Sequence, residues 1–91
     1  MMSFVLPQDV QLKLAGLFQE RRKSKKHSRN LSAELTGVPS ATIRRFEVTG
    51  QISFAQFLML VNVYGDLAIA DNLFPAPKAS SIDELMKQSK G

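Results

Sequence analysis

Two groups of basic side chains in the middle of the sequence could bind phosphate and contact nucleic-acid bases. The segment RRKSKKHSR, residues 21–29, is the most basic stretch of the chain, and Arg44 and Arg45 follow it. Lysine and arginine neutralise phosphates, and an arginine can also form a bidentate hydrogen-bonded pair with O6 and N7 of guanine. These residue types therefore indicate a polyanionic partner.

The positive charge is concentrated in this part of the sequence. Residues 20–50 contain eight Lys or Arg and three acidic residues, whereas the remainder has four bases and five acids. Such an asymmetry favours nucleic acid as the partner, because a cationic surface attracts a polyanion. The alternative interpretation of an isolated basic run is a solvated loop, so the elements around it decide between the two.

The residues around the basic groups have the pattern of two short helices joined by a tight turn. Ser28 is a suitable N-cap for a helix over about residues 29–36, and Gly37 would end that helix in the left-handed conformation. A second helix is expected over about residues 40–48, with Arg44 and Arg45 on its surface. Helix, glycine turn, basic helix and cationic flank are the parts of a helix-turn-helix DNA-binding motif.

In such a motif, side chains near the start of the second helix reach base edges in the major groove. The predicted base-contacting residues are Ser40, Ala41, Thr42, Arg44 and Arg45, with Arg44 as the first choice for a guanine. The predicted phosphate-contacting residues are Lys26, Ser28 and Arg29, at or just before the first helix of the pair. Glu47 is expected to have a structural role, in an internal salt bridge or a helix cap.

Apolar spacing predicts three further helices. The first should start near residue 8 or 9, after Pro7. Its inward stripe is expected to be Val10, Leu14, Leu17 and Phe18. A later helix should start at Ser53 with a capping box completed by Gln56, and it is apolar nearly all round, so we expect it to be central and buried. A short fifth helix, or one face of a dimer, is expected over residues 67–74.

A change in composition divides the chain into residues 1–74 and residues 75–91. Residues 75–80, PAPKAS, are typical of a stiff extended linker, and residues 81–88 begin with a capping box that predicts a short helix. This tail helix is too short to be stable alone. Its apolar side chains are therefore predicted to bind a partner protein, and they are Ile82, Leu85 and Met86.

The central segment resembles the Xre-type, phage-repressor-like helix-turn-helix family. The resemblance covers roughly residues 9–74, and its motif falls on Ala33, Gly37, Val38, Pro39, Thr42, Ile43, Arg45, Phe46 and Glu47. The sequence departs from the family pattern at Pro39, where a serine is usual, and at Ser32, where a leucine is usual. Leu31 is expected to supply the missing apolar group. The resemblance implies an all-α, five-helix, lambda-repressor-like domain, here followed by a short C-terminal helical tail.

A closer resemblance is to small HipB-like regulators, in the start MMSF and the tail LFPAPKASSIDELMKQ. These are similar to antitoxins encoded beside HipA-type Ser/Thr kinase toxins. The resemblance implies a homodimeric autorepressor that binds a pseudo-palindromic DNA operator and also binds the kinase or assembles with it. Two alternatives remain open at this point: a protein-interaction module for which DNA binding is secondary, and general nucleic-acid binding through the basic run.

The sequence gives little support to catalysis or metal binding. It has no cysteine and one histidine, His27, which cannot build a zinc site, and no acidic or nucleophilic cluster suggests an active site. We therefore expect no enzymatic activity and no cofactor. There is no apolar run near 18 residues, and the N-terminus lacks the pattern of a signal peptide, so a cytoplasmic protein without a membrane span is expected.

Overall fold

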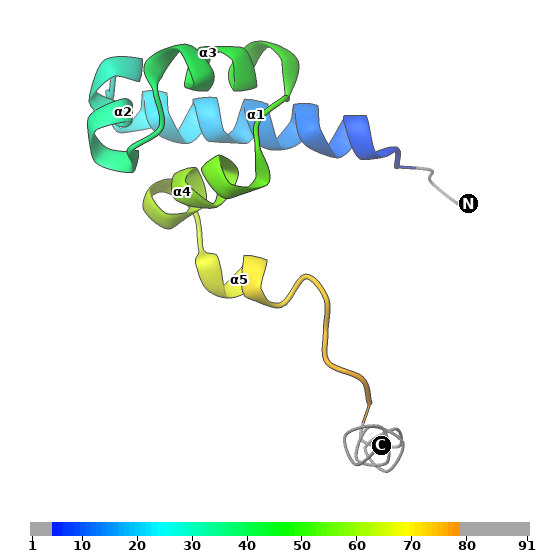
Figure 1. Cartoon of the computed structure of the whole chain (residues 1–91). Helices are drawn as coiled ribbons and strands as arrows, with labels where there is room; N and C mark the ends of the chain where they lie inside the picture. The colour runs from blue at the N-terminus through cyan, green and yellow to red at the C-terminus, as the bar shows by residue number, and fades with distance from the viewer. Residues whose placement is uncertain (1–4, 79–91) are drawn as a thin grey trace.

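The computed structural model describes residues 5–78, and over this range the chain forms five α-helices and no strand (Figure 1). The helices are α1 (Pro7–Ser24), α2 (Arg29–Thr36), α3 (Ser40–Thr49), α4 (Phe54–Tyr64) and α5 (Leu67–Asp71). α1 is the longest; α3 packs along it, α2 packs on α3 and α4, and α5 packs on α4 (Figure 1). The prediction of an all-α fold is confirmed for the described residues.

The helix ends follow the capping residues of the sequence. Ser28 Oγ accepts a hydrogen bond from the backbone amide three residues on, and Gly37 ends α2 with φ of 83°. Gly50 ends α3 in the same left-handed conformation, and Ser53 caps α4 through the amide of Gln56. The predicted capping box is incomplete. Gln56 Oε1 accepts a hydrogen bond from the Ser53 hydroxyl and not from the Ser53 backbone amide.

One apolar core joins α1, α3 and α4. Its buried residues are Ala15, Phe18, Val38, Ile43, Phe46, Leu60 and Tyr64. The ring of Phe18 meets Tyr64 edge-on with 5.2 Å between ring centroids, and it meets Phe46 in a tilted contact at 5.8 Å. Aromatic pairs in these orientations stabilise a core beyond the area that they bury.

The predicted inward stripe of α1 is wrong in most of its members. Phe18 is buried, but the predicted partners Val10, Leu14 and Leu17 are 38–45% exposed. The buried face is instead formed by Ala15, Phe18 and Arg22. α1 also begins at Pro7, earlier than predicted, since proline is well tolerated in a first helical turn.

The predicted packing of α2 is also corrected. Leu31, expected to replace a missing core leucine, is exposed, and so is Leu35. Ser32 is fully buried instead, and its Oγ lies 2.7 Å from Tyr64 Oη. A buried phenol needs a hydrogen-bond partner, and the serine hydroxyl supplies one where a leucine could not.

The expectation that α4 is central and buried holds for only one of its faces. Leu60 and Tyr64 are buried, but Phe54 and Met59 on other faces are exposed. A short fifth helix forms, but it ends at Asp71, before the predicted residue 74, and its five residues are too few to cover the rest of α4. Large apolar side chains therefore stay exposed on α4, on α5 and just after α5, and the most exposed are Phe54, Leu67, Ile69, Leu73 and Phe74.

Residues 75–78 carry no regular secondary structure. The predicted tail helix over residues 81–88 lies outside the described residues. None of the helices within residues 5–78 combines the length and the apolar character needed to cross a membrane.

Candidate nucleic-acid interface

The residues predicted to contact bases lie together on the first two turns of α3. Ala41, Arg44 and Arg45 are exposed, whereas Ser40 and Thr42 are half-buried. Ile43 and Phe46 point the opposite way, into the core. α3 therefore has a fixed inner face and a solvent-facing surface that combines two guanidinium groups with small side chains.

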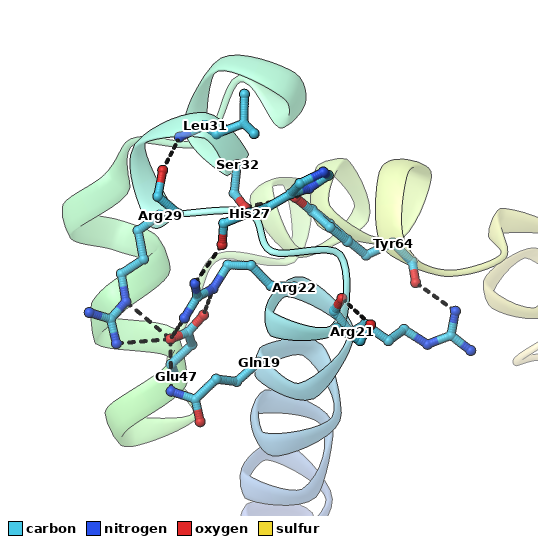
Figure 2. Close-up of polar contacts among 11 residues, drawn as sticks. Gln19, Arg21, Arg22, His27, Arg29, Leu31, Ser32, Glu47 and Tyr64 are labelled. Atoms are coloured by element: carbon cyan, nitrogen blue, oxygen red, sulfur yellow. Dashed lines mark hydrogen bonds and ion pairs between the residues drawn. The ribbon is translucent and has the colours of Figure 1, made fainter.

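Glu47 fixes the inner side of α3 through a cluster of hydrogen bonds (Figure 2). Its side chain is fully buried, and its two carboxylate oxygens accept donors from three residues of α1 and α2. Arg22 Nε lies 2.7 Å from Oε2 and Arg22 Nη2 lies 3.0 Å from Oε1. Arg29 Nη2 lies 2.9 Å from Oε1, and Gln19 Nε2 donates to the same oxygen at 3.1 Å. The predicted structural role of Glu47 is confirmed.

The electrostatic environment keeps Glu47 ionised. Burial by itself raises the pKa of this carboxyl, but the hydrogen bonds and positive charges of Arg22 and Arg29 outweigh burial. The pKa of Glu47 therefore lies below its ordinary value of 4.5. The cluster is thus a buried ionic contact that joins α1, α2 and α3.

Arg22 belongs to the basic run, but its charge is internal. It is buried, and besides Glu47 it donates from Nη1 to the carbonyl oxygen of His27 at 2.8 Å. Arg29, predicted to contact phosphate, is also bound to Glu47, although its side chain remains 36% exposed. Part of the Arg29 side chain is therefore accessible at the N-terminus of α2, whereas Arg22 is buried.

The loop between α1 and α2 holds the other predicted phosphate contacts at the surface. Lys26 is exposed and adopts φ of 58°, a left-handed conformation at the turn, and Ser28 is exposed at the N-terminus of α2. The loop is anchored because His27 Nδ1 lies 2.7 Å from Tyr64 Oη, which also contacts Ser32 (Figure 2). Both Lys26 and Ser28 are thus accessible on a backbone that is tied to α4.

The core residue Tyr64, not named among the predicted site residues, joins three elements by hydrogen bonds. Its hydroxyl contacts His27 and Ser32, and its carbonyl oxygen accepts a bond from Arg21 Nη1 at 3.1 Å. Sequence reasoning also missed Gln51, whose Oε1 accepts a hydrogen bond from Arg45 Nη2 at 2.8 Å. No local pattern in the sequence indicates either contact, although the position of Gln51 just after a helix-ending glycine brings it near the last turns of α3.

The predicted partner-binding residues of the tail, Ile82, Leu85 and Met86, lie outside the described residues. No group of three or more His, Asp or Glu side chains within residues 5–78 is arranged to hold a metal ion. No protein-family model, curated protein or solved structure matches this chain.

Proposed function

We propose that this protein is a sequence-specific DNA-binding transcriptional repressor in which α2 and α3 act as a helix-turn-helix. The observation that carries the proposal is the two-sided character of α3. Ile43, Phe46 and Glu47 hold its inner side, while Arg44 and Arg45 face solvent. A rigid helix with accessible guanidinium groups fits the major groove of DNA, because donors held in place discriminate between base edges.

The proposed contacts divide into base reading and backbone positioning. The arginines of α3 would pair with guanines, each good bidentate pair contributing about 1–3 kcal/mol of discrimination. Ser40, Ala41 and Thr42 would contact neighbouring bases. Lys26, Ser28 and Arg29 would contact phosphate; their accessible positions at the N-terminus of α2 support this, since a helix N-terminus favours an anion. Phosphate contacts position the protein without reading sequence.

A homodimer on a pseudo-palindromic operator is part of the proposal. One copy presents one reading helix, and two copies would place two such helices about 34 Å apart, one turn of DNA. The exposed apolar residues of α4 and α5 support a subunit contact. Phe74 is 94% exposed, and Leu67, Ile69 and Leu73 are also exposed. Several large apolar side chains exposed on one short segment are typical of an interaction site.

The resemblance to Xre-type and HipB-like regulators supports a more specific role. We propose that the protein is the antitoxin of a toxin–antitoxin operon, that it represses its own promoter in the cytoplasm, and that it binds a HipA-type Ser/Thr kinase toxin. In this proposal Ile82, Leu85 and Met86 contact the kinase. The role requires no enzymatic activity and no cofactor of its own.

Fluorescence anisotropy tests the proposed DNA binding. A labelled duplex from upstream of the protein's own gene is compared with a random duplex at about 50 and 200 mM salt. We expect a preference of about a thousandfold or more for the upstream duplex, which persists at the higher salt. Equal affinities that collapse together at the higher salt would reject sequence-specific repression and leave only a cationic surface.

A second candidate function is a protein-interaction module for which DNA binding is secondary. The open apolar surface on α4 and α5 favours it. Capture of a HipA-type kinase encoded in the same operon is measured for the full chain and for a chain that lacks residues 75–91. Loss of capture without loss of DNA binding would assign docking to residues 75–91, whereas undiminished capture would exclude them as the docking element.

A further inference from the structure

We infer that Gln51 is a positioning residue that holds the guanidinium group of Arg45 in the orientation needed to contact a base. The inference rests on the proposed function, because it assigns a reading role to Arg45. It goes further by placing part of the DNA specificity in a residue that lies outside α3 and outside the predicted set of contacts.

Three hydrogen bonds close a ring around the end of α3. Arg45 Nη2 donates to Gln51 Oε1 at 2.8 Å, and the Gln51 backbone amide donates to Thr49 Oγ1 at 3.1 Å. The Thr49 hydroxyl in turn donates to the carbonyl oxygen of Arg45 at 2.7 Å. The Gln51 side chain is therefore bonded directly to Arg45, and the Gln51 backbone amide is linked to Arg45 through Thr49.

The position of Gln51 is itself fixed by the turn before it. Gly50 is buried and has φ of 77°, a conformation that residues with a side chain rarely adopt. A Cβ at Gly50 would lie 3.1 Å from the backbone carbonyl carbon of Gln11, so α1 packs directly against this turn. Gln51 therefore leaves α3 in one direction, and its exposed side chain is held beside Arg45 by the hydrogen bond between them.

The chemistry of an amide suits this role. The carbonyl oxygen of Gln51 restrains Arg45 through one N–H, and the other guanidinium donors remain available for a guanine. A carboxylate would hold the arginine equally well, but it would cancel the positive charge that attracts DNA. Gln51 thus removes side-chain freedom from Arg45 before DNA binds without lowering the charge of the interface.

Arg44 provides the contrast within the same helix. No hydrogen bond or ion pair holds its side chain among residues 5–78. A free arginine loses more rotamer entropy when it forms a bidentate pair. Arg45 should therefore contribute more base discrimination than Arg44, although sequence reasoning placed Arg44 first.

The first arm of the test needs no DNA. Side-chain ¹⁵N relaxation of Arg45 Nε is measured for the full chain and for Gln51→Ala and Gln56→Ala. Gln56 lines the same polar hollow beside α3 but bonds to Ser53, which makes Gln56→Ala the matched control. We expect a restrained Arg45 in the wild type and the control and a mobile one in Gln51→Ala. A mobile Arg45 in the wild type would overturn the inference.

The second arm measures the preference for the upstream duplex over a random duplex. We expect Gln51→Ala to lower this preference by about threefold to tenfold while its melting temperature stays near that of Gln56→Ala. Gln51→Glu should keep Arg45 restrained but bind both duplexes more weakly. An unchanged preference in Gln51→Ala would overturn the inference even if Arg45 becomes mobile.

The two arms separate failure of the inference from failure of the proposed function. A wild type without preference for the upstream duplex would reject both the repressor and the reading role of Arg45. The relaxation data would then still establish whether Gln51 restrains the arginine. A wild type with the expected preference, unaffected by Gln51→Ala, would reject only the positioning role.

Discussion

Arg22 on α1 and Glu47 on α3 form a buried, two-pronged ion pair, with 2.7 Å between Arg22 Nε and Glu47 Oε2 and 3.0 Å between Nη2 and Oε1. The two residues are 25 positions apart in the sequence, and their side chains are 7% and 0% exposed. Through this pair the C-terminal part of α1 holds the inner side of the helix that we propose enters DNA.

Loss of the Glu47 charge should strongly destabilise the fold. Glu47→Gln keeps the size of the side chain but leaves Arg22 as a buried charge without its counter-ion. We expect a loss of about 3 kcal/mol in the free energy of unfolding, measured by urea denaturation. Glu34→Gln on the exposed surface of α2 is the charge-matched control, and it should change stability by less than about 0.5 kcal/mol. Similar losses in the two variants would contradict the structural role of the pair.

Acid should remove the contribution of the Glu47 carboxylate to the free energy of unfolding. The folded-state pKa of Glu47 is lowered, so the stabilisation is complete above the ordinary value of 4.5 and is lost as the pH falls through the lower folded-state pKa. Urea denaturation between about pH 7 and pH 3 should show a steeper acid loss for the wild type than for Glu47→Gln. If the free energy of unfolding falls equally with pH in the two proteins, the Glu47 carboxylate does not contribute to the acid loss of stability.

The hydroxyl groups of Ser32 and Tyr64 should stabilise the fold as a coupled pair. They lie 2.7 Å apart in the buried region between α2 and α4, and His27 Nδ1 contacts the same phenol. We expect Tyr64→Phe to cost about 1–3 kcal/mol, since it leaves buried partners without a hydrogen bond. The double variant Ser32→Ala/Tyr64→Phe should cost less than the sum of the single variants in a double-mutant cycle. Strict additivity would show that the two groups do not interact.

The arginines of α3 should affect specific binding more than general binding. Arg44→Ala and Arg45→Ala should each weaken binding to the upstream duplex by at least about tenfold more than binding to a random duplex. Lys13→Ala on α1 removes the same charge from an exposed position outside α2 and α3, and it should leave the ratio of the two affinities unchanged. Anisotropy titrations measure both affinities. Equal losses on the two duplexes would assign the arginine in question to phosphate contact alone.

The exposed apolar surface of α5 should mediate association of two copies. Ile69→Glu places a charge at a site that is 68% exposed in the single chain, so the fold itself should tolerate it. We expect this variant to sediment as a monomer at concentrations where the wild type is a dimer, and to lose operator affinity. Leu12→Glu on the exposed side of α1 is the control and should leave the dimer intact. A dimeric Ile69→Glu variant would place the interface elsewhere.

The sequence by itself determined the all-α class and several of the helix ends. Ser28, Gly37, Gly50 and Ser53 act on backbone groups within a few residues of themselves, so their effect is readable without knowledge of the fold. The same holds for the exposure of Arg44, because Ile43 and Phe46 define the inner face of a short amphipathic helix. The order of the helices and the existence of a basic surface on α3 follow from such local patterns.

Only the tertiary structure decided which faces of the helices other than α3 are buried and which side chains contact one another. The rotation of α1 and α2 about their axes depends on what packs against them, and so Ala15 and Ser32 are buried where larger neighbours were expected. The charged partners of Glu47 lie 18 and 25 residues away, and the three helices must be assembled before their charges meet. The Arg45–Gln51 contact likewise depends on the packing of Gly50 against α1, a long-range interaction that no local pattern encodes.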